Sequence, residues 1–168
     1  MTRQQMLKQY RVVIGIVVLL LTLSCDKLDD DRIPPAPVRI SFTTVGDWNT
    51  FGIGGALDSR IFIKENLEPA GYHYTALSAT GFGGVILVGD VNGTPAAYDL
   101  ACPVERKRDV RIFVNKKEMV GECPECHSTY DIFSLGGYPL TGVAADKGYG
   151  LRRYNVGPGR SEYMIVTN

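Results

Sequence analysis

Cys102-Pro103-Val104-Glu105 and Cys123-Pro124-Glu125-Cys126-His127 are the two most informative segments of this 168-residue sequence. Seventeen residues separate them, and each begins with a Cys-Pro pair. Two Cys-x-x-Cys pairs about 15–20 residues apart are typical of a tetrahedral zinc site, but Glu105 stands where one cysteine belongs. Metal or redox chemistry is therefore expected at these two segments, here named the first knuckle (residues 102–105) and the second knuckle (residues 123–127).

The sequence around the knuckles predicts an all-β fold. Turn-forming residues recur every eight to twelve positions, and the segments between them are short and rich in β-branched and aromatic residues. Hairpin turns are predicted at residues 90–93, which contain Asn92-Gly93, and at residues 115–118. Gly52, Gly54 and Gly55 favour a loop over a short helix between Val45 and Leu57. The predicted strands are Val38–Phe42, Arg60–Lys64, Tyr72–Ala76, Val85–Gly89, Ala96–Ala101, Val110–Val114, Met119–Cys123, Tyr130–Phe133, Leu151–Val156 and Tyr163–Thr167.

The order of motifs between Gly84 and Val156 is distinctive. An apolar run at 84–88 and the segment 97–103 lead into the first knuckle, and the second knuckle continues through Ser128-Thr129-Tyr130-Asp131. Further matches follow at Gly137, Gly142-Val143-Ala144, Leu151 and Tyr154-Asn155-Val156. Together these residues resemble the Rieske iron–sulfur domain, whose second knuckle reads C-P-x-H-G-S-x-[FY]-D. The resemblance implies antiparallel sheets or a small barrel over residues 38–168, with an inserted two-knuckle subdomain, similar to a rubredoxin or zinc ribbon, at about 98–145.

The resemblance fails at the metal ligands. A Rieske cluster needs two cysteines on one iron and two histidines on the other. Val104 and Cys126 occupy the two histidine positions, and His127 stands where the family has glycine. His73, the remaining histidine, matches neither knuckle, and Val143 replaces a proline of the family's covering loop. The matching positions therefore do not supply a standard two-Cys, two-His cluster.

Three interpretations of the remaining cysteines stay open. The sequence favours a disulfide from Cys102 to Cys123 or Cys126 in an oxidising compartment, with no cofactor, although this pairing leaves one thiol over. The second is a closed, structural zinc site of three thiolates and a fourth ligand from Glu105 or His127. The third is a variant [2Fe-2S] cluster with three cysteines and His127, which would make the protein an electron carrier.

The N-terminus predicts export. Three basic residues and no acids precede or enter the apolar run Val12 to Leu23, which is shorter than the roughly 20 residues that span a bilayer. The run ends in Leu21-Thr22-Leu23-Ser24-Cys25, which resembles the lipobox of bacterial lipoproteins. We therefore expect a signal peptide at 1–24, lipidation of Cys25, and an acidic, proline-rich tether at 25–37. The acidic residues 26–31 are similar to a signal that sends some lipoproteins to the outer face of the outer membrane.

The charge and the motifs of the chain argue against some classes of function. Without residues 1–24 the chain carries 15 Lys and Arg against 18 Asp and Glu, a net charge of −3, and it shows no basic stripe for nucleic acid. No catalytic arrangement is identified, because the glycine-rich segments do not open helices and a Ser-His-acid set lacks its motif. The sequence thus predicts a lipid-anchored envelope protein with a structural or binding role, with electron transfer or structural zinc as the alternatives and with an unknown protein partner.

Overall fold

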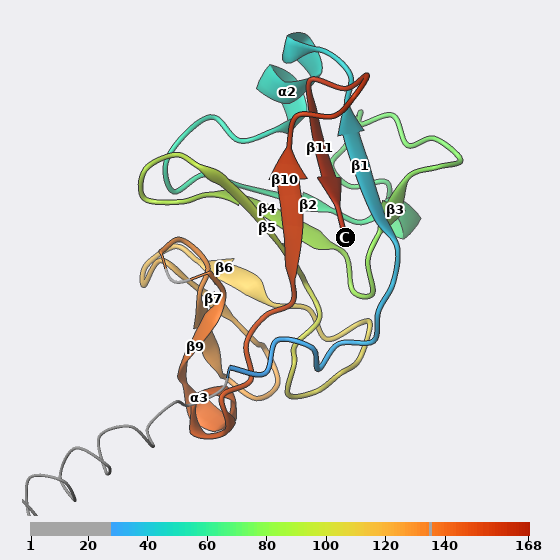
Figure 1. Ribbon diagram of the computed structural model, residues 1–168. Helices are drawn as coiled ribbons and strands as arrows, with labels where there is room; N and C mark the ends of the chain where they lie inside the picture. The colour runs from blue at the N-terminus through green and yellow to red at the C-terminus, as the bar shows by residue number, and fades with distance from the viewer. Residues whose placement is uncertain (1–27, 135) are drawn as a thin grey trace, which may run out of the picture.

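The structure is a computed structural model that describes residues 28–134 and 136–168. It is all-β, as the sequence predicts, and consists of two antiparallel sheets with two short helices at opposite ends of the molecule (Figure 1). The larger sheet has the strand order β2-β4-β5-β10-β11-β1-β3 and curls toward a barrel, and the smaller one has the order β6-β7-β8-β9. No helix in the described part of the chain is both long and apolar enough to cross a bilayer. The predicted signal peptide and Cys25 lie outside the described residues.

The chain passes from the large sheet into the small one and back. Strands β6 to β9, followed by α3, are inserted between β5 and β10, so both knuckles belong to this insertion or to its borders. The large sheet comprises β1 (Val38–Phe42), β2 (Ser59–Phe62), β3 (Ala79–Thr80), β4 (Val85–Gly89), β5 (Pro95–Asp99), β10 (Arg153–Gly157) and β11 (Met164–Thr167). The small sheet comprises β6 (Phe113–Asn115), β7 (Val120–Glu122), β8 (Thr129–Asp131) and β9 (Tyr138–Thr141). The helical segments are α2 (Val45–Phe51), a 3-10 turn at Lys64–Asn66, and α3 (Gly142–Lys147).

Two apolar cores lie on the two faces of β4 and β5. Val85 and Leu87 face a core shared with β1, β10 and β11, whereas Ile86 and Val88 face a second core that contains the knuckle residues Cys102 and Cys123. Strand β4 is therefore buried along its whole length. The small sheet, whose strands have only three or four residues each, depends on this second core for its position.

Most predicted strands are present, with ends shifted by a few residues, and both predicted hairpin turns are confirmed. Residues 72–76 form no strand, contrary to the prediction. Instead the Tyr72 hydroxyl accepts from the Ser41 amide at 3.0 Å and donates to the Ser41 carbonyl oxygen at 2.8 Å. The backbone groups at this edge of β1 are thus hydrogen-bonded by a side chain rather than by the backbone of a neighbouring strand.

The prediction of a loop between Val45 and Leu57 is wrong for the first half of this segment, which forms α2. Thr44 and Asp47 make a reciprocal capping box at the start of this helix. Gly52, the first of the three glycines that argued against a helix, is the C-cap residue. The glycines therefore end the helix rather than prevent it.

Residues 28–37, predicted as a tether, lie along the domain as an N-terminal strap. The amide of Asp29 donates to the Gly148 carbonyl at 2.8 Å, and the Asp29 carbonyl accepts from Gly150 at 2.9 Å. Ile33 is fully buried. The Arg152 guanidinium donates to the Ile33 carbonyl oxygen at 2.8 Å. The folded part of the chain thus begins well before the Val38 expected from the proline-rich sequence.

Asp99 joins the large sheet to the first knuckle. Its buried carboxyl group accepts hydrogen bonds from the amides of Phe82, Gly83 and Ala101 at 2.8–3.0 Å, and from the Tyr154 hydroxyl at 2.6 Å. Leaving any one of these donors buried and unpaired would lower the stability of the fold by about 1–3 kcal/mol. The carboxyl group therefore fixes the direction in which the chain leaves β5, three residues before Cys102.

Candidate metal centre

The two knuckles end in the same type of hydrogen-bonded turn. The amide of Arg106 donates to the Cys102 carbonyl at 2.8 Å, and the amide of His127 donates to the Cys123 carbonyl at 3.1 Å. Both donors are four residues after their cysteine, and both have left-handed backbone angles, with φ of 56° and 53°. Glycine adopts this conformation most readily, so glycine would occupy either position with less strain.

The knuckles bring three cysteine sulfurs together. The Sγ atoms of Cys102, Cys123 and Cys126 all lie within 4.8 Å of one another, and those of Cys102 and Cys126 are 3.6 Å apart. A disulfide requires about 2.05 Å between sulfurs, and the three cysteines are free thiols in this structure. Two thiolates on one tetrahedral zinc, with Zn–S bonds of about 2.3 Å, lie ~3.8 Å apart. The group can therefore hold a metal ion.

Backbone amides point at all three sulfurs. Those of Val104 and Glu105 donate to Cys102, those of Glu125 and Cys126 donate to Cys123, and that of Ser128 donates to Cys126. Hydrogen bonds of this kind stabilise a thiolate more than a thiol. These hydrogen bonds favour the ionised sulfurs and oppose the effect of burial.

The three thiols differ in acidity. Burial raises the pKa of Cys123 to about 12 and also raises the pKa of Cys102, despite the hydrogen bonds that both sulfurs accept. Burial acts in the same direction on Cys126, but the hydrogen bonds with the hydroxyl and amide of Ser128 and with the thiols of Cys123 and Cys102 together outweigh it and lower the pKa of this thiol. Without a bound cation, Cys126 is therefore the thiol that ionises first.

Two hydroxyl groups adjoin the sulfurs. Ser128 Oγ lies 3.3 Å from Cys126 Sγ and accepts from the Ala144 amide of α3 at 3.2 Å. The Tyr130 hydroxyl lies 3.6 Å from Cys102 Sγ, and burial, with the Cys102 charge, raises the pKa of this phenol. The Rieske resemblance assigns Ser128 and Tyr130 by their position in the sequence alone. The contact with α3 was not foreseen, because neither α3 nor β9 was predicted.

The predicted fourth ligands do not join the sulfur group. Of the Cys, His, Asp and Glu side chains in the described ranges, only the three cysteines form a group of this kind. The His127 side chain is 74% exposed and lies 3.8 Å from the Glu122 carboxylate. Glu105 is 3.8 Å from Lys107. Val104 packs against the core that contains the sulfurs, in the place where the Rieske resemblance puts a histidine.

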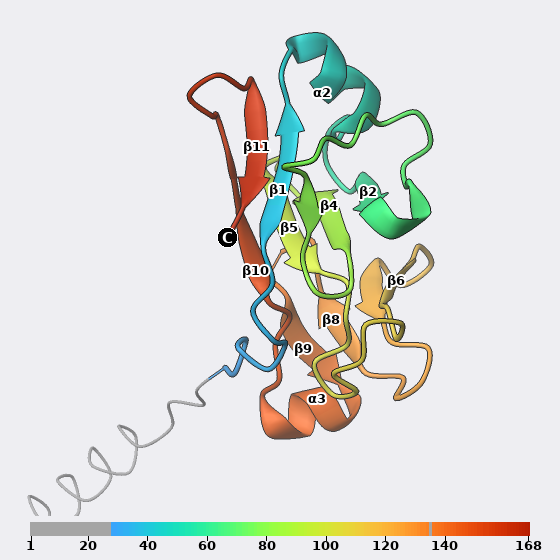
Figure 2. The same cartoon turned by 90° about the vertical axis from the view of Figure 1, so that its right-hand side faces the viewer.

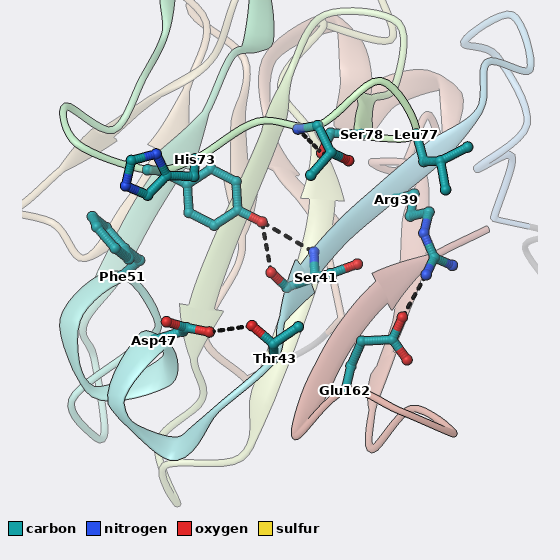
Figure 3. A pocket seen from close by; sticks show the side chains of 11 residues that line it. Arg39, Ser41, Thr43, Asp47, Phe51, His73, Leu77, Ser78 and Glu162 are labelled. Carbon is teal, nitrogen blue, oxygen red and sulfur yellow. Dashed lines mark hydrogen bonds and ion pairs between the residues drawn. The ribbon is translucent and has the colours of Figure 1, made fainter.

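A second feature, a cavity of about 390 Å³, lies away from the sulfurs beside α2 and the edge of β1 (Figure 3). His73 lines it, which agrees with its having no place in either knuckle. Its other polar residues are largely engaged with one another, as Arg39 is with Glu162 and Thr43 is with Asp47. The cavity therefore offers no set of free groups that would specify a ligand.

Comparisons of this chain with models of known protein families, with curated proteins and with solved structures gave no match.

The acidity of the thiols gives a testable order of alkylation. In metal-free protein at neutral pH, iodoacetamide should modify Cys126 first and Cys123 last, because the thiolate is the reactive form. The rate at Cys126 should rise with pH and level off at a pH below the pKa of an ordinary thiol. Peptide mapping by mass spectrometry over a pH series measures both effects. Ser128→Ala should slow the reaction at Cys126, and equal rates at Cys123 and Cys126 would contradict the assignment.

Proposed function

We propose that this chain is a lipid-anchored protein of the bacterial cell envelope whose Rieske-like domain holds a single metal ion, zinc, on the thiolates of Cys102, Cys123 and Cys126. The ion has a structural role and replaces the iron–sulfur cluster of the family. The observation that carries the proposal is the group of three sulfurs within 4.8 Å of one another. Five backbone amides directed at these sulfurs support it further.

Zinc suits the chemistry of these ligands. Thiolates bind it firmly, and its charge offsets the cost of burying Cys102 and Cys123 in ionised form. Binding must displace protons from these thiols, so the affinity should fall as the pH is lowered. The three cysteines supply three donors, and a tetrahedral ion takes a fourth from water or from a nearby hydroxyl group.

A structural role follows from where the ligands lie. Cys102 comes from the connection after β5 of the large sheet, whereas Cys123 and Cys126 lie in the connection between β7 and β8 of the small sheet. An ion bound to all three would join the two sheets at their shared core. Strands of three or four residues gain little stability by themselves, so this cross-link would matter for the fold.

The second candidate function is electron transfer through a variant [2Fe-2S] cluster. It is favoured by the hydroxyls of Ser128 and Tyr130, since hydrogen bonds to ligand sulfurs tune cluster potentials. It is disfavoured by the ligand geometry. A cluster needs ligands at both irons, and the three clustered sulfurs suit one ion better. At the second iron, Val104 has no donor atom and His127 faces solvent.

The envelope location is supported by the N-terminal sequence alone. The basic start, the apolar run of residues 12–23 and the lipobox-like residues before Cys25 together indicate lipoprotein processing. The acidic residues 26–31 indicate transport to the outer membrane and exposure on its outer face.

Metal analysis of the domain tests the metal assignment. Residues 28–168, purified without oxygen, should be colourless and contain one zinc per chain. Replacement of zinc by cobalt(II) should give thiolate-to-cobalt charge-transfer bands, and X-ray absorption should show three sulfur ligands and one lighter atom. Stoichiometric iron with acid-labile sulfide would support electron transfer instead. A protein that stays metal-free with a Cys102 disulfide would support the inert, cofactor-free alternative.

A further inference from the structure

We propose that the domain is held with its metal-containing end against the membrane surface, so that α3 and the start of the N-terminal strap face the bilayer. This inference rests on the lipid anchor at Cys25 in the proposed function. It concerns the orientation of the folded domain, which the anchor alone does not determine, because a long flexible tether would leave the domain free to rotate.

The first step is the length of chain between the anchor and the fold. Leu28 is three residues after Cys25, and three residues span at most ~11 Å even when fully extended. Leu28 itself contacts the domain, since its side chain lies about 3 Å from where a Cβ on Gly150 would be. The attachment point on the domain is therefore within roughly 11 Å of the lipidated residue.

The second step is that the strap is firmly attached. Asp29 forms a parallel bridge with Tyr149 through two backbone hydrogen bonds. The Arg32 guanidinium stacks 3.8 Å from the centre of the Tyr149 ring. Arg152 binds the Asp31 carboxylate and the Ile33 carbonyl oxygen, both at 2.8 Å. Peeling the strap away would break these contacts and expose Ile33, which is fully buried.

The third step is where the strap begins. The first described residues lie beside α3, while α2 and the connection between β10 and β11 lie at the opposite end, and the two perpendicular views agree (Figures 1 and 2). The exposed apolar residues Leu140 and Val143, each 41% exposed, belong to this same end of the molecule. The acidic strap residues oppose deep insertion into an anionic surface. We therefore expect contact at the headgroups rather than penetration of the hydrocarbon.

The orientation places the metal centre close to the bilayer. The α3 amide of Ala144 bonds to Ser128, which in turn bonds to Cys126. On the other side, Arg106 Nε donates to the Arg32 carbonyl oxygen of the strap at 3.0 Å, just after the first knuckle. The sulfurs thus lie directly behind the membrane-facing surface. A partner that delivers or removes the metal would have to work at the membrane.

Tryptophan fluorescence in vesicles tests the orientation. The chain has one tryptophan, Trp48 in α2, at the end that should point away from the bilayer. A second form, Trp48→Phe with Val143→Trp, moves the single indole probe to α3. Full-length lipidated protein is reconstituted in phosphatidylcholine vesicles that contain a headgroup nitroxide lipid. Quenching of the α3 probe should be several-fold stronger than quenching of Trp48, because the ends of a domain of about 140 residues lie ~35–40 Å apart.

A spacer variant is the matched control. Twenty Gly and Ser residues inserted between Lys27 and Leu28 span ~25 Å on average, and they should lower the quenching of the α3 probe toward that of Trp48. Intact mass and detergent partition report lipidation independently. Lipidated protein with equal quenching at both positions would overturn the orientation and leave the anchor intact. Protein without lipid on Cys25 would overturn the anchor and the orientation together.

Discussion

Cys123→Ser is expected to abolish metal binding and to unfold the small sheet while the large sheet survives. Cys123 is fully buried, and its sulfur is the ligand that receives two amide hydrogen bonds from the second knuckle. Structural zinc contributes on the order of 10 kcal/mol to the folding of small zinc domains, which is comparable to the whole stability of a typical domain. Amide hydrogen exchange should therefore become fast in β6 to β9, and the metal content should fall to zero.

The surviving large sheet makes this outcome specific. Its inner core, formed by β1, β4, β10 and β11, contains no cysteine, so its amides should stay protected in the variant. Val110→Thr is the matched control, because Val110 is 5% exposed in the same core as Cys123. It buries a hydroxyl at a cost of about 1–3 kcal/mol but keeps all three thiols. A Cys123→Ser protein with full metal content and unchanged exchange would disprove the structural role.

The fold class could be predicted because local signals dominate most of this chain. Turn residues such as Asn92-Gly93 fix a hairpin, and alternating residues such as Val110 and Ile112 mark a buried face. The failures have tertiary causes. Residues 72–76 have strand-forming composition, but the segment meets β1 through the Tyr72 hydroxyl, which bonds to the backbone of Ser41. The strap looks like a free proline-rich linker, and only its contacts with Tyr149 and Arg152 reveal that it is packed.

The candidate site was predictable in its ligands but not in its geometry. The spacing of Cys102, Cys123 and Cys126 identified the three sulfurs, because two knuckle loops at this separation bring their cysteines close together. The same sequence offered Glu105 and His127 equally well. The structure decides against His127, whose ring lies in solvent. Adjacent residues of a tight loop often point apart, and His127, the neighbour of Cys126, is 74% exposed.

The triple variant Val104→His, Cys126→His, His127→Gly is expected to bind a [2Fe-2S] cluster where the natural chain does not. It restores both histidine positions of the Rieske resemblance, and it places glycine at the left-handed position 127, where φ is 53°. Val104 already packs against the core that contains the sulfurs, so a histidine there starts close to them. Cys102 and Cys123 would hold one iron and the two histidines the other.

Anaerobic reconstitution with iron and sulfide measures this gain. The triple variant should turn brown, bind two irons per chain and show a reduction potential within about −150 to +300 mV, the range of clusters with two histidine ligands. Val104→His alone and Cys126→His alone are the matched controls, because each leaves one iron short of a ligand. A triple variant that keeps the fold, judged by hydrogen exchange of both sheets, but takes up no iron would count against the Rieske-like arrangement of the knuckles. Uptake by the triple variant alone would mean that these three side chains, and not the backbone of the knuckles, keep the natural chain from holding a cluster.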